Sequence, residues 1–542
     1  MKPLFTSLLA LLLLTACKEN DSEQAKKAAS ISNLQRHTEY LSDDLCQGRK
    51  PFSSGADRAV NYLAAEMKAI GLKPISGDSY FQEVPLVLSE TECSDNMTLH
   101  TPEGTSTLKY MEDFVAFSKR LEPEIDINNA ELIFAGYGIS APEYGKNDFS
   151  GIENPENKVA LVIVNDPGLG STGSYFKGDT MTYYGRWMYK YEEGARQKLK
   201  GVLIIHEDRG AGYPWNVVAA GAKSKLYIDN KEDKDYYCPL EGWITNQAAK
   251  ELLKNNGYDL DELTEKAKAP GFQPIPLKST VNVSMHNQFT YDNSPNVVGY
   301  IEGKKNNGES IVYTAHWDHL GYGKSIDGDT IINGATDNAT AMAWLLETAR
   351  AFKALKQQPE RNIVFLVPTC EETGFQGTFY YVEHPIFPIE KTAAVINLDV
   401  IPLWGENNDV TITGYGQSSL DNTIADIAKK YNRYVMADPD AYNGMFYRSD
   451  HVPFIRKGVP AMFAKGWNDN REHGKEWAAG KIKDYWANIY HKPTDQTHPG
   501  TDNYEGVMQE VYLFFDLGYL LANSSGFPQW KLDSEFANIL KR

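Results

Sequence analysis

Hydrophobic and polar positions alternate with two different periods along residues 290–523. Short apolar runs at residues 311–315, 362–368 and 393–398 are typical of buried strands, whereas the apolar positions over residues 342–352 and 507–521 recur at helical spacing. Strands that alternate with helices are typical of α/β proteins. The pattern therefore predicts an α/β fold with a mixed, largely parallel central sheet flanked by helices.

The pattern before residue 290 predicts two further parts of the chain. Residues 30–72 carry two helical stripes separated by a glycine-containing loop, and residues 81–88 are typical of a strand. Residues 96–285 contain many glycines and aromatics and short strand-like runs, the clearest at 131–138, 159–164 and 201–206. We therefore expect an α/β domain in two parts, 30–95 and 286–525, with an inserted β-rich domain at 96–285 and a C-terminal tail at 526–542.

The first residues have the layout of an export signal. A basic start is followed by an apolar run at residues 8–14 and then by Thr15, Ala16 and Cys17. This run is too short to span a membrane, which takes roughly 20 residues. The cysteine resembles that of the bacterial lipobox, so we expect a lipoprotein signal peptide at 1–16, a lipid anchor on Cys17 and a tether at 17–29. The protein would then be exported and held at the bacterial cell envelope, at the outer membrane, the cell surface or the periplasmic face.

Composition excludes one class of partner and one kind of metal site. The 542-residue chain has 42% hydrophobic residues, a formal net charge of -18 and a pI near 5.2, whereas nucleic-acid binding needs a basic surface. The cysteines after Cys17 form no Cys-x-x-Cys pair, which argues against a thiolate zinc site. An oxidising compartment would permit one disulfide, whose pairing the sequence does not determine. These cysteines are Cys46, Cys93, Cys238 and Cys370.

Candidate metal ligands follow the ends of the three apolar runs. Each run is followed within a few residues by a histidine or a carboxylate, and the carboxyl ends of parallel strands meet at one edge of a sheet, where ligands gather. Two more candidates lie in loops, one before the helix near Thr340 and one late in the chain. The candidates are His316, Glu371, Glu372 and Asp399 after the runs, and Asp337 and His491 in the loops.

Ligands of these types suit a pair of zinc ions. Two histidines and three carboxylates match zinc chemistry, and a carboxylate can bridge two ions roughly 3.5–4 Å apart. The same ligands accept Mn²⁺ or Co²⁺, so the native metal stays open. Of the neighbours Glu371 and Glu372, one can bind metal while the other takes a proton from water. Asp318, two residues after His316, is placed to accept the second N–H of that imidazole.

Each of these residues also has a purely structural interpretation. A pair of glutamates in a loop is usually only solvated, because charged side chains stay outside. His319 is left out of the ligand set, since it can support a ligand or the fold instead. His451 either lines the substrate pocket or has a structural role. The hypothesis of a metal site rests on the coincidence of five ligands, an orienting acid and a base at loop positions of one domain.

Five short motifs contain these residues: His316-Trp-Asp318-His-Leu-Gly, Asn333-Gly-Ala-Thr-Asp337-Asn338-Ala, Glu371-Glu372-Thr-Gly, Asn397-Leu-Asp399 and Tyr490-His491-x-Pro-x-Asp495. They resemble the motifs of the co-catalytic di-zinc metallopeptidase family that includes bacterial leucyl aminopeptidases and glutamate carboxypeptidase. The resemblance extends over nearly the whole chain after the signal peptide. In the insert, Phe134-Ala-Gly-Tyr-Gly138 and Asp148-Phe-Ser-Gly151 resemble the protease-associated domain of many members.

This resemblance implies a zinc exopeptidase fold with an inserted protease-associated domain, two zinc ions and peptide substrates. It implies hydrolysis of peptide bonds at peptide termini, in the first place as an aminopeptidase. Glu371 would be the general base and Asp318 the acid that orients His316. The implied ligands are His316 and Asp399 on one zinc, Glu372 and His491 on the other, and Asp337 bridging both.

Three other functions stay open at this stage. The same fold serves carboxypeptidases and other amide hydrolases, because its ligands do not determine which end of a peptide enters. The complete ligand set argues against a non-catalytic, receptor-like relative, and retention of Asp337 disfavours a glutaminyl-cyclase-like transferase with one zinc. The loops around Trp404, 442–448 and Trp467 are our prediction for the substrate pocket. The preferred side chain, the oligomeric state and the role of the insert are not determined by the sequence.

Overall fold

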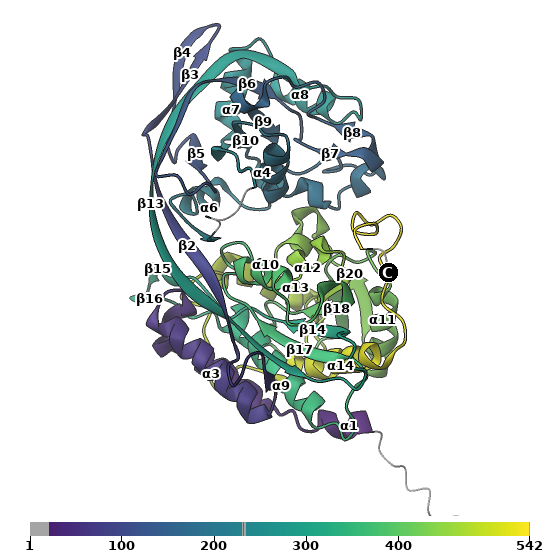
Figure 1. The fold of residues 1–542 in the computed structure, drawn as a ribbon. Helices are drawn as coiled ribbons and strands as arrows, with labels where there is room; N and C mark the ends of the chain where they lie inside the picture. Colours follow the sequence, from purple (N-terminus) through teal and green to yellow (C-terminus); the bar gives the residue numbers. More distant parts are fainter. Residues whose placement is uncertain (1–20, 230, 232–234, 541–542) are drawn as a thin grey trace, which may run out of the picture.

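The computed structural model describes residues 21–229, 231 and 235–540 and has two lobes, drawn one above the other in Figure 1. The lower lobe holds the α/β sheet. The upper lobe is built mainly from residues between the strands β2 (Phe81–Cys93) and β13 (Ile275–Ile301). Each lobe has its own hydrophobic core. The predicted signal peptide and Cys17 lie outside the described residues.

The lower lobe contains a mixed sheet with a parallel centre, which confirms the predicted fold class. Its strand order is β1-β13-β17-β14-β18-β21-β19-β20. The pairs β17–β14, β14–β18, β18–β21 and β19–β20 are parallel, whereas β13–β17 and β21–β19 are antiparallel. The strands of this lobe are β1 (Lys73–Pro74), β14 (Ser310–Thr314), β17 (Asn362–Val367), β18 (Thr392–Asn397), β19 (Asp409–Ile412), β20 (Tyr434–Ala437) and β21 (Ala461–Lys465), with the separate hairpin β15 (Gly321–Ile326) and β16 (Asp329–Ile332).

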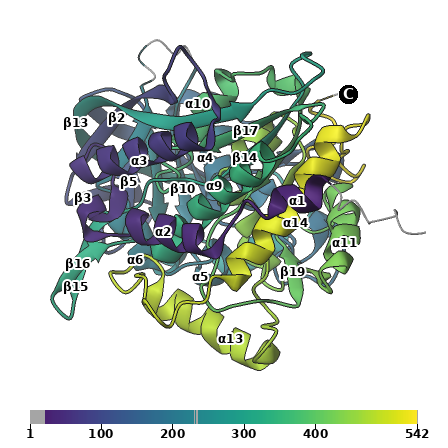
Figure 2. The ribbon, with the colours of Figure 1, turned by 90° about the horizontal axis from the view of Figure 1, so that it is seen from below.

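Helices cover both faces of this sheet, which explains the continuous apolar runs of its strands. Ile311 and Tyr313 of β14 belong to the core beneath α9 and α14, whereas Val312 belongs to the core beside α10 and α12. Figure 2 shows α2, α3, α9 and α14 together on the lower face. The helices are α1 (Asp21–Lys26), α2 (Ile31–Leu41), α3 (Ser54–Ile70), α9 (Thr340–Lys353), α10 (Gln376–Glu383), α11 (Leu420–Lys430), α12 (Val452–Arg456), α13 (Gly474–Asp484) and α14 (Glu505–Asn523).

The upper lobe is β-rich, with a parallel centre and antiparallel edges. β6, β9, β10 and β12 pair in parallel in that order, while β5 and the first half of β13 close the two edges in antiparallel fashion. Its elements are β3 (Asn96–Thr101), β4 (Gly104–Lys109), β5 (Phe114–Phe117), β6 (Glu124–Phe134), β7 (Ser140–Ala141), β8 (Lys146–Asn147), β9 (Lys158–Ile163), α4 (Trp187–Arg196), β10 (Gly201–Ile205), α5 (Asp208–Ala211), α6 (Trp215–Ala220), β11 (Ser224–Ile228), β12 (Leu240–Ile244), α7 (Asn246–Lys254) and α8 (Leu260–Ala267).

Two long strands run through both lobes. β2 pairs along its whole length with part of β13, from Phe81 opposite Val297 to Cys93 opposite Met285. The first half of β13 also pairs with β6 of the upper lobe, and its last residues pair with β17 of the lower lobe. The predicted domain boundary at 285/286 falls inside this unbroken strand. The lobes therefore share a continuous sheet at this boundary.

Both ends of the described chain pack on folded structure. Residues 17–29 are predicted to be a tether, but α1 lies within them, Ala25 is buried, and the Nζ of Lys26 lies 3.2 Å from Oδ1 of Asp516 in α14. The chain is therefore part of the lower lobe from Asp21 onward. The stretch predicted as a C-terminal tail also packs inward, since Phe536 is buried. We call residues 524–540 the C-terminal segment.

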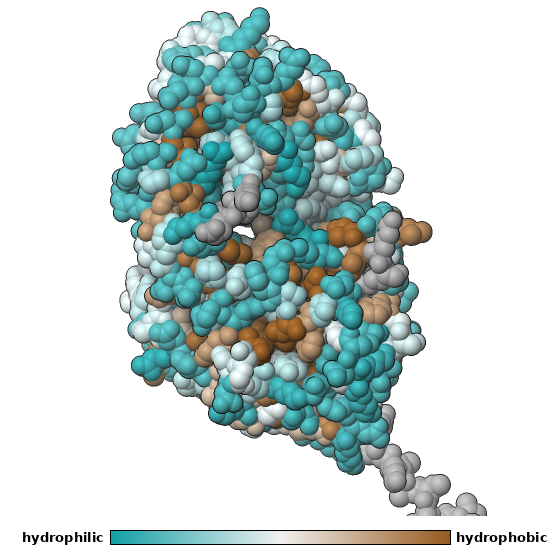
Figure 3. Space-filling model, in the orientation of Figure 1, coloured by the Kyte–Doolittle hydropathy of each residue, from teal (hydrophilic) through white to brown (hydrophobic). Residues whose placement is uncertain are grey.

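Neither disulfides nor membrane-spanning helices are found in the part of the chain that the structure describes. Cys46, Cys93, Cys238 and Cys370 are free thiols. Over residues 21–229, 231 and 235–540, no helix is both long and apolar enough to cross a membrane. Figure 3 shows a largely hydrophilic surface with a hollow between the lobes.

The packing of α14 on β14 can be tested at Gly518. A Cβ atom at this position would lie 1.7 Å from the hydroxyl oxygen of Tyr313, which donates a hydrogen bond to the carbonyl of Phe514. We expect Gly518→Ala to lower the free energy of unfolding by about 1–3 kcal/mol, because overpacking displaces neighbouring groups. In the control Gly480→Ala the new Cβ meets nothing within 4 Å, and we expect a gain of about 0.5–1 kcal/mol. Denaturant unfolding measures both, and equal stability of Gly518→Ala and wild type would contradict this packing.

Candidate metal centre

Three parallel strands bring the first candidate ligands to one edge of the sheet. Thr314 at the end of β14 is level with Leu366 of β17 and Asn397 of β18. The residues that follow these ends are His316, the pair Glu371 and Glu372, and Asp399. The other two candidates come from irregular turns, Asp337 within residues Ala335–Ala339 and His491 just after Tyr485–Ile489.

The candidate ligands form two groups that meet at Asp337. His316, Glu371 and Asp399 make one group, and His319, Asp337, Glu372 and His491 make the other, with their ligand atoms within 4.8 Å of one another in each group. Oδ1 of Asp337 lies 3.4 Å from Nε2 of His316, and Oδ2 lies 3.4 Å from Nε2 of His491. Asp337 therefore faces both groups at once.

The spacing of these atoms fits metal coordination. Nε2 of His316 lies 3.5 Å from Oδ1 of Asp399, and Nε2 of His491 lies 3.1 Å from Oε2 of Glu372. Two ligand atoms at the usual distances from a tetrahedral zinc are about 3.3–3.6 Å apart. Within the described part of the chain, four buried atoms have no hydrogen-bond partner: Nε2 of His316, Nε2 of His491, Oδ1 of Asp337 and Oδ1 of Asp399. Buried polar atoms normally have partners, so a cation would satisfy all four.

His319 belongs to the second group, although the sequence-based ligand set omitted it. Its Nδ1 lies 2.5 Å from Oε1 of Glu372, and its ring is buried. Its Nε2 has no hydrogen-bond partner among the described atoms. The contact with Glu372 places His319 where it orients that carboxylate.

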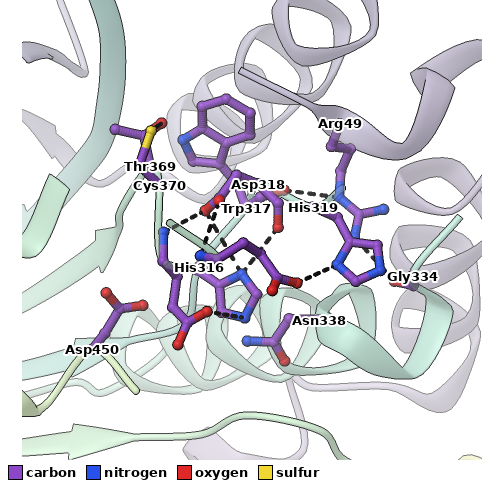
Figure 4. Close-up of polar contacts among 12 residues, drawn as sticks. Arg49, His316, Trp317, Asp318, His319, Gly334, Asn338, Thr369, Cys370 and Asp450 are labelled. Carbon is purple, nitrogen blue, oxygen red and sulfur yellow. Dashed lines mark hydrogen bonds and ion pairs between the residues drawn. The ribbon is translucent and has the colours of Figure 1, made fainter. Parts of the chain in front are cut away.

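The prediction for the Asp318 carboxylate is only partly met. Nδ1 of His316 lies 3.0 Å from the backbone carbonyl of Asp318 and 3.8 Å from its Oδ1, so the carbonyl is the hydrogen-bond acceptor. The carboxylate instead accepts the backbone N–H of Glu371 at 3.0 Å and that of Glu372 at 3.3 Å. Figure 4 shows Asp318 among these groups. Asp318 therefore fixes the two glutamates as well as the neighbouring histidine.

The site concentrates negative charge around its histidines. Burial alone would lower the pKa of His316, but Glu371, Asp337 and Asp399 raise it well above its ordinary value. Burial likewise opposes protonation of His491, whose pKa is nevertheless raised to about 10 by Glu372 and Asp337. Both imidazoles thus lie in a field that favours positive charge, which is the charge that a divalent cation supplies.

Arg49 supports the ligand loops and was not singled out by any sequence pattern. Its guanidinium is fully buried and donates to the carbonyls of Trp317 at 2.8 Å, Asn333 at 2.6 Å and Gly334 at 3.0 Å. Figure 4 shows Arg49 beside Gly334, at the side of the site away from Asp450. One side chain from the N-terminal part thus ties together the loops that carry His316 and Asp337.

Asp495 holds the backbone at Asp337 from the side opposite Arg49. Its Oδ1 accepts the N–H of Thr336 at 2.9 Å, and its Oδ2 accepts the N–H of Asp337 at 3.0 Å. The backbone is also in the left-handed region at His491, with φ 57°, at Cys370 beside Glu371, with φ 58°, and at Val400 beside Asp399, with φ 57°. Such conformations persist only where surrounding contacts enforce them, and they gather at functional sites.

Two further contacts fix Asp399, and the neighbouring His451 is structural. Oγ of Ser449 donates to Oδ2 of Asp399 at 2.9 Å, and Nζ of Lys465 donates to its carbonyl at 2.8 Å. His451 is fully buried and bonded to the carbonyl of Phe446 and to Asn397, and burial lowers its pKa to about 4. Of the two interpretations of His451, the structure favours the structural one.

The sequence around this site is similar to sequences of known proteins. Residues 296–513 match the model of peptidase family M28. Over 205 residues, 36% of this chain and 26% of the relative, the sequence is 32% identical to the aminopeptidase NAALADL1 of Mus musculus. Over 139 residues, 26% of this chain and 30% of the relative, it is 32% identical to leupeptin-inactivating enzyme 1 of Streptomyces exfoliatus. The chain therefore spans about a quarter to a third of the length of these curated relatives.

Solved structures with a similar chain path are distant in sequence. An aminopeptidase from Aneurinibacillus sp. strain AM-1 has 17% identity and a TM-score of 0.48, covering 93% of this chain and 97% of that one. A zinc aminopeptidase from Bacillus subtilis has 17% identity and a TM-score of 0.41, covering 96% and 98%. At this distance no residue role is carried over from them.

The support that Arg49 gives to the ligand loops can be tested by substitution. Arg49→Met removes the donors to Trp317, Asn333 and Gly334 while keeping an unbranched side chain that reaches the position of Nε. We expect affinity for zinc to fall about 10–100-fold, as when residues that orient metal ligands are changed. Competition with a chromogenic chelator measures this, with Arg58→Met on the exposed side of α3 as the control. A folded Arg49→Met protein that binds zinc as tightly as wild type would refute the role.

Proposed function

Because residues 296–513 match the model of peptidase family M28, we propose that this chain is a zinc-dependent exopeptidase that removes residues from the amino terminus of peptides. The observation that carries the proposal is the placement of Asp337, whose two oxygens each lie 3.4 Å from a histidine of a different ligand group. A carboxylate that faces both groups is what a two-metal centre requires. Among the matched relatives, one is an aminopeptidase, which supports the choice of peptide end.

The two groups divide the proposed ligands between two zinc ions. His316 and Asp399 would hold one ion, Glu372 and His491 the other, and Asp337 would bridge them. His319 would keep Glu372 in position through the contact at its Oε1. Manganese and cobalt remain alternatives, because the same nitrogen and oxygen donors accept them.

Glu371 is the proposed general base. Its carboxylate lies 3.9 Å from Nε2 of His316 and belongs to the same group, while its backbone N–H is held by Asp318. Bound zinc ions lower the pKa of water and polarise the substrate carbonyl. Glu371 accepts a proton from the attacking water and returns it to the departing amine nitrogen.

Aromatic side chains form a wall beside the second ligand group. Tyr490 stacks on His491 with ring centroids 3.7 Å apart, and Trp467 lies close to both Tyr485 and Trp404. The side chain of His491 is 30% exposed, so this side of the site is open to solvent. We assign the wall to the apolar part of the peptide substrate, as the sequence-based pocket prediction around Trp404 and Trp467 also proposes.

A carboxypeptidase is the second candidate, because Arg186 and Arg448 lie close together, Arg448 is adjacent to Ser449, which contacts Asp399, and neither arginine pairs with an acid among the described residues. The side chain of Arg186 from the upper lobe is nearly buried, and burial and then Arg448 lower its pKa to about 9. The Nε atoms of Arg186 and Arg448 both lack a hydrogen-bond partner among the described residues. The nearly buried Arg186 together with the partly buried Arg448 suits a carboxylate, such as the carboxyl terminus of a short peptide.

The location of the protein is a further part of the proposal. We retain the prediction of an exported lipoprotein anchored through Cys17, which rests on the layout of residues 1–17 alone. The substrates would then be peptides met at the cell envelope, and the inserted domain is proposed to be protease-associated.

The role of Glu371 predicts a specific loss. Glu371→Gln keeps the size of the side chain but removes the proton acceptor, so we expect kcat on leucine 4-nitroanilide to fall about 10²–10⁴-fold. Zinc content measured by atomic emission should stay at the wild-type level, because Glu371 is not among the proposed ligands. In contrast, Asp399→Asn is expected to lower zinc content and activity together. A wild-type rate in Glu371→Gln would contradict the assignment of Glu371 as the general base.

The choice of peptide end predicts a pattern across substrates. An aminopeptidase cleaves leucine 4-nitroanilide and free tripeptides but not the same compounds with an acetylated amino terminus. A carboxypeptidase shows the reverse preference, cleaving blocked peptides with a free carboxyl terminus, and then depends on Arg186. We expect the first pattern, measured by release of 4-nitroaniline and by chromatography of the peptides. Cleavage of acetylated but not amidated peptides would instead establish the second candidate.

A further inference from the structure

The C-terminal segment ends between the two lobes and carries a buried acid there. In Figure 1 it rises from α14 along the lower lobe to the level of the upper lobe. The side chain of Glu535 is only 4% exposed. A carboxylate so deeply buried is costly unless its oxygens are paired, and the pairing shows what the segment does.

Glu535 accepts hydrogen bonds from both lobes. Its Oε1 accepts the backbone N–H of Tyr183 in the upper lobe at 2.9 Å and the hydroxyl of Tyr447 in the lower lobe at 2.5 Å. Its Oε2 pairs with Nζ of Lys177 of the upper lobe at 2.8 Å. Burial would raise the pKa of Glu535, but Lys177 and these hydrogen bonds hold it below the ordinary value. The ionised carboxylate therefore joins two parts of the fold.

Neighbouring residues hold the segment against the lower lobe. Nε1 of Trp530 donates to the carbonyl of Gly458 at 2.9 Å, and the N–H of Lys531 donates to that of Gln417 at 2.8 Å. The buried ring of Phe536 lies 6.4 Å, centroid to centroid, from the rings of both Tyr183 and Tyr447. These contacts hold the chain on both sides of Glu535 in place.

The loop that Glu535 contacts leads directly to the metal centre. Tyr447 is two residues before Ser449, whose hydroxyl donates to Asp399. Between them, Nη2 of Arg448 donates to the carbonyl of Ala211 in the upper lobe at 2.9 Å. Farther along, Arg456 of the lower lobe pairs with Glu192 of the upper lobe at 2.8 Å. Residues 441–449, which we call the junction loop, therefore connect the upper lobe to a ligand.

We infer that Glu535 is a positioning residue for the peptidase reaction: it fixes the junction loop and the upper lobe relative to each other, and so shapes the path of a peptide between the lobes. The inference rests on the proposed function. Residues 524–540 lie outside the part matched by the family model, which ends at residue 513.

The test compares a short and a long substrate in Glu535→Gln. This variant keeps the shape of the side chain but removes the charge that pairs with Lys177. We expect kcat/KM for a leucine-initiated tetrapeptide to fall about tenfold, mainly through KM, as for loss of a charged hydrogen bond. Leucine 4-nitroanilide, which extends little beyond the cleaved bond, should change by less than about twofold. The control Asp533→Asn alters an exposed acid two residues away and should leave both substrates unchanged.

A second variant separates positioning from stability. Tyr447→Phe removes only the hydroxyl that donates to Glu535, so it should reproduce the rise in KM, and the double variant should add little to either single change. A purely structural role would lower the melting temperature while leaving KM unchanged for both substrates. That result, or equal losses on both substrates, would overturn the inference.

A structural readout keeps this inference separate from the proposed function. If wild-type protein with zinc hydrolyses neither substrate, the proposed function fails, and amide hydrogen exchange then decides about Glu535. Faster exchange over residues 441–449 in Glu535→Gln than in Asp533→Asn supports the positioning role, because the loop has lost its anchor. Identical exchange in the two variants overturns it.

Discussion

The site depends on keeping one carboxylate, that of Asp337, between two groups of ligands at the same time. Two contacts from opposite sides meet this demand: Arg49 binds the carbonyls of Asn333 and Gly334, and Asp495 binds the N–H groups of Thr336 and Asp337. Neither residue belongs to the strands that carry the other ligands. The segment before the first strand and the loop after His491 are therefore as necessary to the centre as the sheet itself.

The two lobes are also held together by contacts from separate parts of the chain. β2 and β13 connect them on one side through continuous pairing. On the other side the junction loop, α12 and the C-terminal segment connect them through Arg448, Arg456 and Glu535 respectively. An insert held at two separated places has little freedom to rotate, so it can serve as a fixed wall of the space between the lobes.

The lower lobe was predictable because buried parallel strands leave uninterrupted apolar runs. β14, β17 and β18 fall within one or two residues of the runs at 311–315, 362–368 and 393–398, and the candidate ligands follow them. Arg49 was not predictable, since an arginine in a glycine-containing loop has the pattern of a solvated residue until the fold buries it. The course of β13 was hidden for a related reason: residues 288–293 are mostly exposed and polar, so the pattern suggested a break where the strand continues.

The Asp318 carboxylate illustrates a limit of a different kind. Its spacing from His316 correctly placed it beside the histidine, but spacing along a chain does not distinguish a carboxylate from the carbonyl of the same residue as acceptor. Its actual partners, the N–H groups of Glu371 and Glu372, arrive from another strand and depend on tertiary geometry.

The pairing of β2 with β13 also sets the order in which the protein can assemble. The partners are separated by roughly two hundred residues of chain, and contacts at such separation form late because loop closure comes first. During synthesis β2 therefore emerges long before its partner, with Val84, Leu86 and Val87, all buried in the finished fold, still uncovered. An unpaired apolar strand is prone to aggregation, so early pairing of β2 with β11, which is made well before β13, would protect the nascent chain.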